Sequence, residues 1–281
     1  MIGEIGGGAA PGLIIRTEGL VHVYAGETRA LDGVDLQIRR GERVAIVGQN
    51  GSGKSTLVRH FNGLLRPTEG RVFVDGVDAL GRRVAHLAAT VGLAFQDPDR
   101  QIFAGKVRGE VAFGPRNLGR SGAELEAAID AALVATGLDR DAQTNPYDLG
   151  YSRRKLLALA SILAMGTPVV VLDEPTTGQD ARGVDRVHRI VADLSAAGRT
   201  VIAISHDMRF VAEAFERVIV MRDGRIVLDG SPAEVFAEAA WPTLASTFLE
   251  PPLAARIGAR LGLGSTPTDD ALLAVLGGGA G

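Results

Sequence analysis

Gly48-Gln49-Asn50-Gly51-Ser52-Gly53-Lys54-Ser55-Thr56 is the stretch that decides the fold of this 281-residue chain. It matches the phosphate-loop pattern G-x-x-x-x-G-K-[S/T] at every fixed position. The apolar residues before it, 43–47, are predicted to form a buried strand, and residues 56–61 to begin a helix. Strand, glycine-rich loop and helix in that order are the context that this motif requires. A chance glycine-rich turn would not bring the lysine, the serine and both flanks into agreement.

The chemistry of the loop explains its composition. Glycines allow backbone N–H groups to converge on phosphate oxygens, and the N-terminus of the following helix adds partial positive charge. Lys54 can reach the outer phosphates of a nucleotide, and Ser55 can offer its hydroxyl oxygen to magnesium. The sequence therefore predicts a site for nucleotide phosphates and a divalent cation.

The composition limits the other classes of function. The formal net charge of −3 gives no global basic field that would favour nucleic acid, and we expect no nucleic-acid partner. The chain has no cysteine, which excludes disulfides and thiolate metal sites. Its first residues lack the basic start and apolar block of a signal peptide, so residues 1–12 are expected to form a flexible leader.

One long apolar stretch could be mistaken for a membrane span. Residues 156–172 are almost wholly apolar, whereas a spanning helix needs about 20 such residues. Gly166-Thr167-Pro168 interrupts the stretch, and Asp173-Glu174 ends it. We therefore predict a buried helix, a turn and a buried strand, in a soluble protein that can still lie against a membrane partner.

The remaining pattern alternates between strands and helices. Strands are predicted within residues 13–47 and at 72–76, 91–96, 169–172, 201–205 and 218–221. Helices are predicted at 124–136, from an N-cap at Ser152 to Met165, at 181–196, and briefly at 231–236. This order predicts an α/β fold with a largely parallel sheet and a helical insert at about residues 97–165. Residues 250–281 could pack on the core, dimerise or stay loose, and they show no chemistry.

Two carboxylates follow the apolar run Val169-Val170-Val171-Leu172. A phosphate loop needs a distant acidic residue for magnesium at the carboxyl end of a neighbouring strand, and Asp173 suits that role. Glu174, one residue further on, could polarise the attacking water. Without the phosphate loop, both would be interpreted as solvated loop residues.

With the phosphate loop and these two carboxylates, the chain resembles an ATP-binding-cassette (ABC) ATPase subunit over about residues 13–235. Pro175-Thr176-Thr177-Gly178-Gln179-Asp180 is similar to the family's D-loop, and Ile204-Ser205-His206-Asp207 to its switch-histidine segment. Gln96 matches the Q-loop glutamine, and Tyr24 the aromatic residue that stacks on adenine. These elements occur in the family's order.

The resemblance implies a P-loop NTPase core with an N-terminal antiparallel β subdomain, a helical insert and a C-terminal extension at 236–281. It implies ATP and Mg²⁺ as cofactors, with ATP bound by Tyr24, Asn50, Gly51, Ser52, Gly53, Lys54, Ser55 and Thr56. It assigns catalysis to Glu174, His206 and Gln96, and the metal to Ser55, Gln96 and Asp173. Taken singly, Tyr24 would be a packing residue, Gln96 an exposed cap, His206 structural and Asp180 a helix N-cap.

The chain departs from the family at the signature sequence L-S-G-G-Q, which meets the nucleotide of the opposite subunit. The aligned residues are Leu149-Gly150-Tyr151-Ser152-Arg153, and only the leucine is retained. Tyr151 puts a bulky side chain where glycine allows close approach to phosphate. Because an altered signature weakens the partner's site, we favour a heterodimer over a homodimer, with a different cassette subunit that completes the site at Lys54. Asp180 is expected to act across the same interface.

Two segments narrow the resemblance to energy-coupling-factor importers. They are Phe95-Gln96-Asp97-Pro98-Asp99-Arg100-Gln101-Ile102-Phe103 and Val111-Ala112-Phe113-Gly114-Pro115-Arg116-Asn117-Leu118-Gly119. This resemblance implies uptake of a vitamin or transition-metal ion. It also implies an integral membrane coupling protein that docks beside Gln96, a substrate-binding membrane subunit, and a peripheral location on the cytoplasmic face of the membrane.

Two other classes share the phosphate loop. Soluble cassette ATPases of DNA repair or the ribosome usually carry long coiled coils or a second cassette, and the sequence shows neither. A P-loop kinase would leave the D-loop and switch histidine unexplained. A switch GTPase would need a guanine-reading N-K-x-D, which the sequence lacks.

Overall fold

The computed structural model describes residues 12–278, so all of the predicted leader except Gly12 lies outside the described residues. The strands are β1 (Leu13–Val23), β2 (Arg29–Arg39), β3 (Arg43–Val47), β4 (Glu69–Val74), β5 (Val77–Asp78), β6 (Val91–Ala94), β7 (Val169–Asp173), β8 (Thr200–Ile204), β9 (Arg217–Arg222) and β10 (Arg225–Gly230). The helices are α1 (Lys54–Phe61), α2 (Val84–Ala88), α3 (Val107–Asn117), α4 (Gly122–Thr136), α5 (Tyr151–Met165), α6 (Ala181–Ala196), α7 (Met208–Ala214), α8 (Pro232–Val235), α9 (Trp241–Ala245), α10 (Leu253–Arg260) and α11 (Asp269–Gly278).

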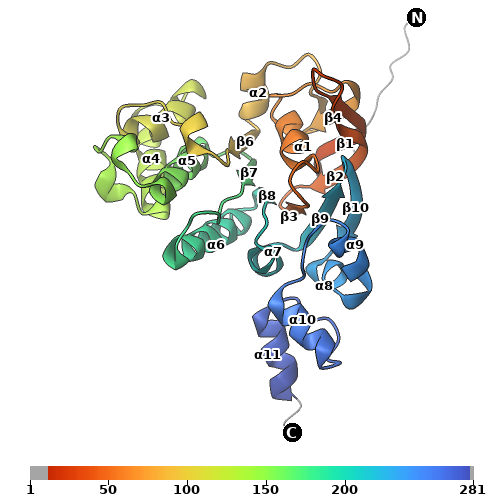
Figure 1. Cartoon of the computed structure of the whole chain (residues 1–281). Coiled ribbons are helices and arrows are strands. Elements are labelled where there is room, and N and C mark those ends of the chain that lie inside the picture. The colour runs from red at the N-terminus through yellow and green to blue at the C-terminus, as the bar shows by residue number, and fades with distance from the viewer. Residues whose placement is uncertain (1–11, 279–281) are drawn as a thin grey trace, which may run out of the picture.

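Two sheets carry the fold (Figure 1). The first has the order β2-β1-β4-β5 and is antiparallel throughout. The second has the order β10-β9-β3-β8-β7-β6, in which only β10 runs antiparallel to its neighbour. The predicted antiparallel N-terminal part and largely parallel core are both confirmed.

The central strands are buried on both faces, which is why their sequences are apolar without interruption. Successive side chains point to opposite faces. Val44 and Ile46 join a core with α1 and the antiparallel sheet, whereas Ala45 and Val47 join a core with α5, α6 and α7. The phosphate-loop helix α1 is thus enclosed between the two sheets.

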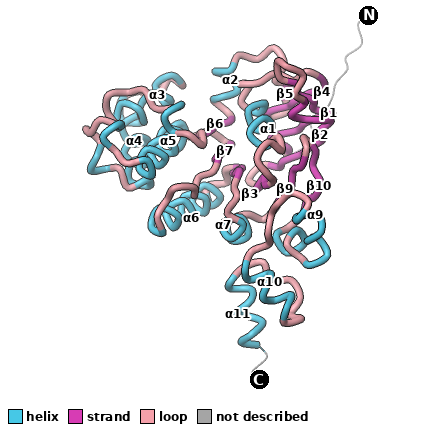
Figure 2. Tube along the Cα trace, in the orientation of Figure 1, coloured by secondary structure: helices cyan, strands magenta, loops and turns pink. Residues whose placement is uncertain are grey.

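Helices α3, α4 and α5 form a separate lobe beside the parallel sheet, within the predicted insert (Figure 2). Residues 156–172 form most of α5, a turn and β7, as predicted. The predicted N-cap at Ser152 is wrong, because α5 begins at Tyr151 with Gly150 as its N-cap. Ser152 Oγ instead donates a hydrogen bond to Gln179 Oε1 (2.6 Å).

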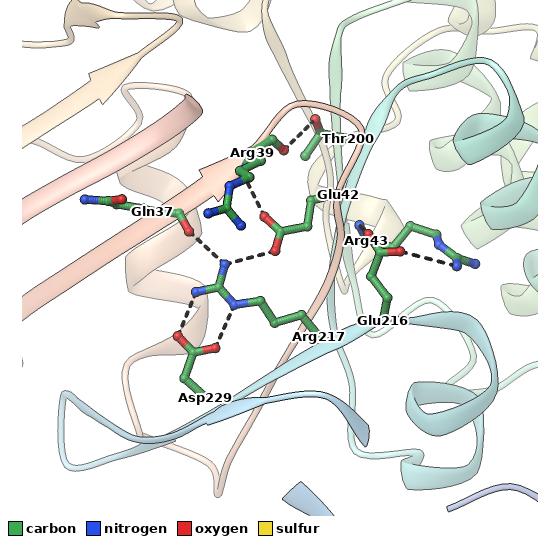
Figure 3. A network of polar contacts seen from close by, with 8 residues as sticks. All are labelled: Gln37, Arg39, Glu42, Arg43, Thr200, Glu216, Arg217 and Asp229. Carbon is green, nitrogen blue, oxygen red and sulfur yellow. Dashed lines mark hydrogen bonds and ion pairs between the residues drawn. The ribbon is translucent and has the colours of Figure 1, made fainter. Parts of the chain in front are cut away.

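A polar network joins β2 and the turn after it to strands β9 and β10 of the other sheet (Figure 3). The Arg217 guanidinium on β9 donates to both carboxylate oxygens of Asp229 on β10 (2.6 and 2.7 Å). It also donates to Glu42 Oε1 (3.0 Å) and to the Gln37 carbonyl of β2 (2.8 Å). The hydrogen bond from Arg217 to Asp229 is the main reason that the pKa of Arg217 is raised.

Residues 250–278 contain α10 and α11, which contact each other at the end of the molecule away from the helical insert (Figure 1). Ser265 Oγ donates to the Ala233 carbonyl (2.6 Å), and Arg209 forms an ion pair with Asp269 (3.0 Å). Residues 250–281 were expected to pack on the core, dimerise or stay loose. The described part of this segment, residues 250–278, packs on the core. Within residues 12–278, none of the helices combines the length and apolar character that a membrane crossing needs.

Candidate functional site

Most of the predicted catalytic and nucleotide-binding residues meet in one cavity of about 300 Å³. Its lining comprises Tyr24, Thr28, Arg29, Ala30, Asn50, Gly51, Ser52, Gly53, Lys54, Ser55, Thr56, Gln96, Asp173, Glu174, Ile204 and His206. The phosphate loop follows β3, and Gln96, Glu174 and His206 follow β6, β7 and β8. Parallel strands place their carboxyl ends at one edge of the sheet, which explains why these distant residues converge.

The phosphate loop requires glycine at two positions. Gly53 has a φ of 101°, and a Cβ there would lie 2.5 Å from the Ala30 carbonyl oxygen. Gly48 has a φ of 147°, and a Cβ there would collide with the Met221 carbonyl. A side chain at either position would therefore displace the backbone that forms the loop.

Lys54 lies at the centre of the loop and is buried. Its Nζ donates to the carbonyls of Gly48 (2.6 Å) and Gln49 (2.8 Å) and to Ser52 Oγ (3.3 Å). Burial lowers the pKa of Lys54, while the nearby carboxylates of Glu174 and Asp173 oppose that shift. The ammonium is thus held beside the backbone groups that would surround a phosphate chain.

Asp173 ends β7 inside the cavity and is buried. Burial, together with the charge of Glu174, raises the pKa of Asp173, and a hydrogen bond from Ser55 opposes that rise. A carboxylate beside a hydroxyl is a donor set that suits magnesium, which usually takes one or two protein carboxylates and completes its shell with water and phosphate. Such a site does not need three protein side chains, and residues 12–278 hold no cluster of three His, Cys, Asp or Glu side chains that could bind a metal.

Glu174 follows Asp173 in a left-handed backbone conformation, with a φ of 54°. Its N–H donates to the Ile204 carbonyl (2.9 Å), and its Oε2 accepts from Thr177 Oγ1 (3.1 Å) and the His206 N–H (3.3 Å). Its Oε1 is buried and has no hydrogen-bond partner within residues 12–278. His206 Nε2 lies 3.2 Å from Oε1, without the orientation of a hydrogen bond. Within residues 12–278, one carboxylate oxygen of Glu174 therefore has no hydrogen bond and lies next to the His206 ring.

Tyr24 also lines the cavity and is 37% exposed. Its hydroxyl is 3.1 Å from Thr56 Oγ1, and its ring meets His22 edge-on at 4.5 Å between centroids. Tyr24 packs against these neighbours while part of its ring stays exposed. Its ring can therefore stack on a planar base.

The signature residues lie outside this cavity, at the first turn of α5. Gly150, Tyr151 and Arg153 are exposed, while Ser152 is half-buried. Arg153 pairs with Asp141, and a Cβ on Gly178 would lie 3.1 Å from the Tyr151 ring. These residues thus form an outward-facing surface next to the D-loop.

Asp180 caps α6 by accepting a hydrogen bond from the Gly183 N–H (2.8 Å). The capping interpretation of Asp180 is therefore confirmed. A role for the same carboxylate across a dimer interface stays a prediction.

Sequence reasoning missed two residues that organise the site. Gln101 joins the Gln96 segment to α5, because its Nε2 donates to the Ala158 carbonyl (2.7 Å) and Ser161 Oγ (2.8 Å). Lys155 is buried and contacts the Glu174 carbonyl, although its place after Arg153 and Arg154 in the sequence is typical of an exposed basic face. Its position among the first apolar residues of α5 was the only signal of its burial.

Comparison with known proteins identifies the family of the chain. A model of the ABC transporter family matches residues 31–177. A putative ABC transporter ATP-binding protein of Caldanaerobacter subterraneus subsp. tengcongensis is 43% identical over 250 residues, and the match covers 89% of this chain but 44% of that protein. The energy-coupling factor transporter ATP-binding protein EcfA of Methanocaldococcus jannaschii is 41% identical over 227 residues, covering 80% of this chain and 81% of the relative.

Solved structures agree as well. The structure of cbiO1 from Clostridium perfringens, described as part of the ABC transporter complex cbiONQ, matches with a TM-score of 0.74 and 35% identity, over 89% of this chain and 99% of that one. A bacterial ABC transporter cassette solved as a dimer matches with a TM-score of 0.71 and 27% identity, over 78% of this chain and 98% of that one. The chain therefore belongs to the ABC transporter ATPase family, as an ATP-binding subunit of the energy-coupling-factor type.

Proposed function

We propose that this chain binds ATP at Lys54 and hydrolyses it at the interface of a cassette dimer, and that this hydrolysis powers an importer of a vitamin or a transition-metal ion. The observation that carries the proposal is the convergence of Lys54, Asp173 and Glu174 on the lining of one cavity. Cation, metal-binding carboxylate and general base are the parts that phosphoryl transfer to water needs.

Each residue has a chemical role in this proposal. Tyr24 stacks on the adenine ring, and residues 50–56 surround the phosphates with backbone N–H groups. Glu174 orients the attacking water and accepts its proton through Oε1. His206, whose side chain is 41% exposed, holds the γ-phosphate and keeps Glu174 in place.

Magnesium fits the residues of the same cavity. Ser55 and Asp173 would hold it, and Gln96, which is exposed on the same lining, would join them. The bound cation would neutralise charge on the terminal phosphates.

The dimer brings a second cassette into contact with the surface that carries Gly150, Tyr151, Ser152 and Arg153. The related cassette solved as a dimer supports this assembly. Tyr151 occupies a position where close approach to a phosphate needs a small residue, and Arg153 replaces the glutamine of the signature, so this surface completes the partner's site poorly. A different cassette subunit would then complete the site at Lys54.

A membrane coupling protein would dock beside Gln96. Phe103 and Phe113 support this placement, since they are 58% and 49% exposed and meet edge-on at 4.6 Å. Exposed aromatic pairs of this kind are typical of protein contacts. The proposal places the chain on the cytoplasmic face of the membrane, with a substrate-binding membrane subunit in the same assembly. The relative described as part of cbiONQ makes a transition-metal ion the first substrate to test.

Isolation of the chain from solubilised membranes tests the proposal. We expect a second cassette subunit and an integral membrane protein to co-purify with it. ATP hydrolysis by the chain alone should be slow, and adding the co-purified cassette should stimulate it at least about tenfold, which corresponds to roughly 1.4 kcal/mol of transition-state stabilisation. Fast turnover by the chain alone would contradict the heterodimer, and co-purification of ribosomes or DNA would contradict the transport function.

A further inference from the structure

Lys155 is a buried cation that the roles described so far do not use. It lies in the second turn of α5 and is 7% exposed. Its Nζ donates to the carbonyl oxygens of Glu174 and Thr177, the latter at 2.8 Å. Burial of an ammonium is costly unless its donors are satisfied, so a lysine in this place needs a reason.

The backbone that Lys155 contacts is the strained part of the site. Glu174 has a φ of 54°, a conformation that is unfavourable for any residue except glycine and persists only where the surroundings impose it. Its N–H donates to the Ile204 carbonyl, and its carbonyl accepts from Lys155 Nζ and, at 3.4 Å, from the Thr177 N–H. Together these hydrogen bonds fix the orientation of the peptide units on both sides of Glu174.

The same contacts hold the segment that steadies the carboxylate. Thr177 Oγ1 donates to Glu174 Oε2 (3.1 Å), while the Thr177 carbonyl accepts from Lys155 Nζ. A single ammonium therefore fixes both the backbone of Glu174 and the residue that orients its side chain. The nearby charges of Glu174 and Asp173 favour the charged form of Lys155, against the lowering of its pKa by burial.

Lys155 also connects this backbone to the surface of the molecule. Tyr151, Ser152 and Arg153 occupy the turn of α5 that precedes it, on the surface next to the D-loop. Ser152 and Gln179 exchange hydrogen bonds of 2.6 and 3.1 Å, which join that turn to the same loop. A displacement of the start of α5 would therefore reach Glu174 through Lys155.

We infer that Lys155 is a positioning residue, which holds Glu174 in the geometry for hydrolysis and ties that geometry to the position of the signature turn. This inference rests on the proposed function of Glu174 as the general base. It predicts that Lys155 affects the rate of the chemical step and leaves ATP binding unchanged, because the ammonium contacts the backbone of Glu174 and Thr177 and Lys155 is not part of the cavity lining.

Single-turnover ATP hydrolysis by the full chain, with the co-purified cassette present, tests this inference. We expect Lys155→Met to lower the hydrolysis rate about 10- to 100-fold, the range found when a group that orients a functional residue is removed. The Kd for ATP should stay within about twofold of the unmodified chain, a change of roughly 0.4 kcal/mol. Leu157→Val is the matched control, since it creates a small cavity in the same helix away from Glu174.

The decisive measurement combines Lys155→Met with Glu174→Gln. If Lys155 acts through Glu174, the two losses do not add, and the double variant hydrolyses ATP at the rate of Glu174→Gln. Additive losses, a Kd for ATP that rises in parallel, or an equal loss in Leu157→Val would overturn the inference. If Lys155→Met does not fold, Lys155→Gln, which keeps a donor for one carbonyl, should give a smaller loss with the same lack of additivity.

The baseline separates failure of this inference from failure of the proposed function. An unmodified chain that does not bind ATP, or a Glu174→Gln variant that hydrolyses at the normal rate, would overturn the role of Glu174 and the inference with it. A normal rate in Lys155→Met beside a slow Glu174→Gln variant would overturn the role of Lys155 alone.

Discussion

At the scale of single residues, the site depends on charges held where water is largely excluded. Lys54, Asp173 and Glu174 are all buried, yet each has polar neighbours that define its position. An ion pair or a charge-assisted hydrogen bond is stronger in such a setting than at the surface. The loss of one member therefore has a direct effect on ligand binding or chemistry.

Lys54→Ala tests the phosphate site itself. The variant removes the only lysine that lines the cavity, and we expect the Kd for ATP to rise about 10- to 100-fold, as loss of a charge-assisted hydrogen bond implies. Isothermal titration calorimetry in the presence of magnesium measures the Kd for ATP. Lys106→Ala, which removes an exposed lysine on the helical insert, is the control and should bind ATP normally. Unchanged affinity in Lys54→Ala would contradict the site.

At the scale of elements, helix α1 must hold the phosphate loop against both sheets. His60 lies on the buried face of α1 and contacts β1 through His22, with 3.2 Å between His60 Nε2 and His22 Nδ1. His60 Nδ1 lies 2.8 Å from the Thr56 carbonyl, which can only accept, so Nδ1 carries the hydrogen and Nε2 is the acceptor in the neutral ring. Protonation of Nε2 would replace that acceptor with a donor.

The stability of α1 should therefore depend on pH through His60. Burial lowers the pKa of His60 below its usual 6.5. The unfolded chain then binds the proton first, so the contribution of His60 is complete above about pH 6.5 and is lost as the pH falls below that value. We expect the free energy of unfolding of the chain to fall by up to about 1.4 kcal/mol per pH unit more steeply than that of His60→Gln between pH 6.5 and 5.5.

Urea unfolding at a series of pH values measures this difference. Both proteins share every other ionisable residue, so the difference between their slopes reports proton binding by His60 together with its contact to His22. His86→Gln, at an exposed histidine of α2, should keep the slope of the unmodified chain. Identical slopes for the unmodified chain and His60→Gln would show that His60 does not titrate differently on folding.

At the scale of the whole molecule, two sheets of different topology must keep a fixed relation, because Tyr24 comes from one and Glu174 from the other. The network of Figure 3 lies at their junction, with Gln37 and Glu42 at β2 and its turn and Arg217 and Asp229 on the parallel sheet. The Arg217 side chain is only 22% exposed and donates hydrogen bonds to three residues, so these bonds are shielded from water.

Arg217→Met keeps the apolar stem and removes these bonds. We expect a loss of about 1.5–3 kcal/mol in the free energy of unfolding, the range for hydrogen bonds to charged groups. Chemical denaturation measures it, and Arg225→Met is the matched control. Arg225 is 68% exposed in its pair with Asp32, and an exposed pair contributes at most about 1 kcal/mol. Equal losses in the two variants would show that the junction depends on neither pair.

Local chemistry was readable from the sequence wherever the functional groups are contiguous. The phosphate loop, the strand ending in Asp173 and Glu174, and helix α6 were all predicted within a few residues of their observed bounds, because apolar period and glycine spacing act over short distances. Ser152 is not an N-cap because α5 begins at Tyr151, which puts Ser152 inside the helix, where its hydroxyl donates to the distant Gln179 side chain.

The sequence by itself determined that this chain folds around a phosphate loop, as an α/β nucleotide-binding protein of the ABC type. Only the tertiary structure decided how distant groups meet: Lys155 with Glu174 across 19 positions, His22 with His60 across 38, and Glu42 with Arg217 across 175. The physical reason is that backbone conformation follows from neighbours along the chain, whereas burial of a charge follows from packing between elements. The role of Lys155 in an apolar helix can therefore be inferred only from the carbonyl groups to which it donates in the tertiary structure.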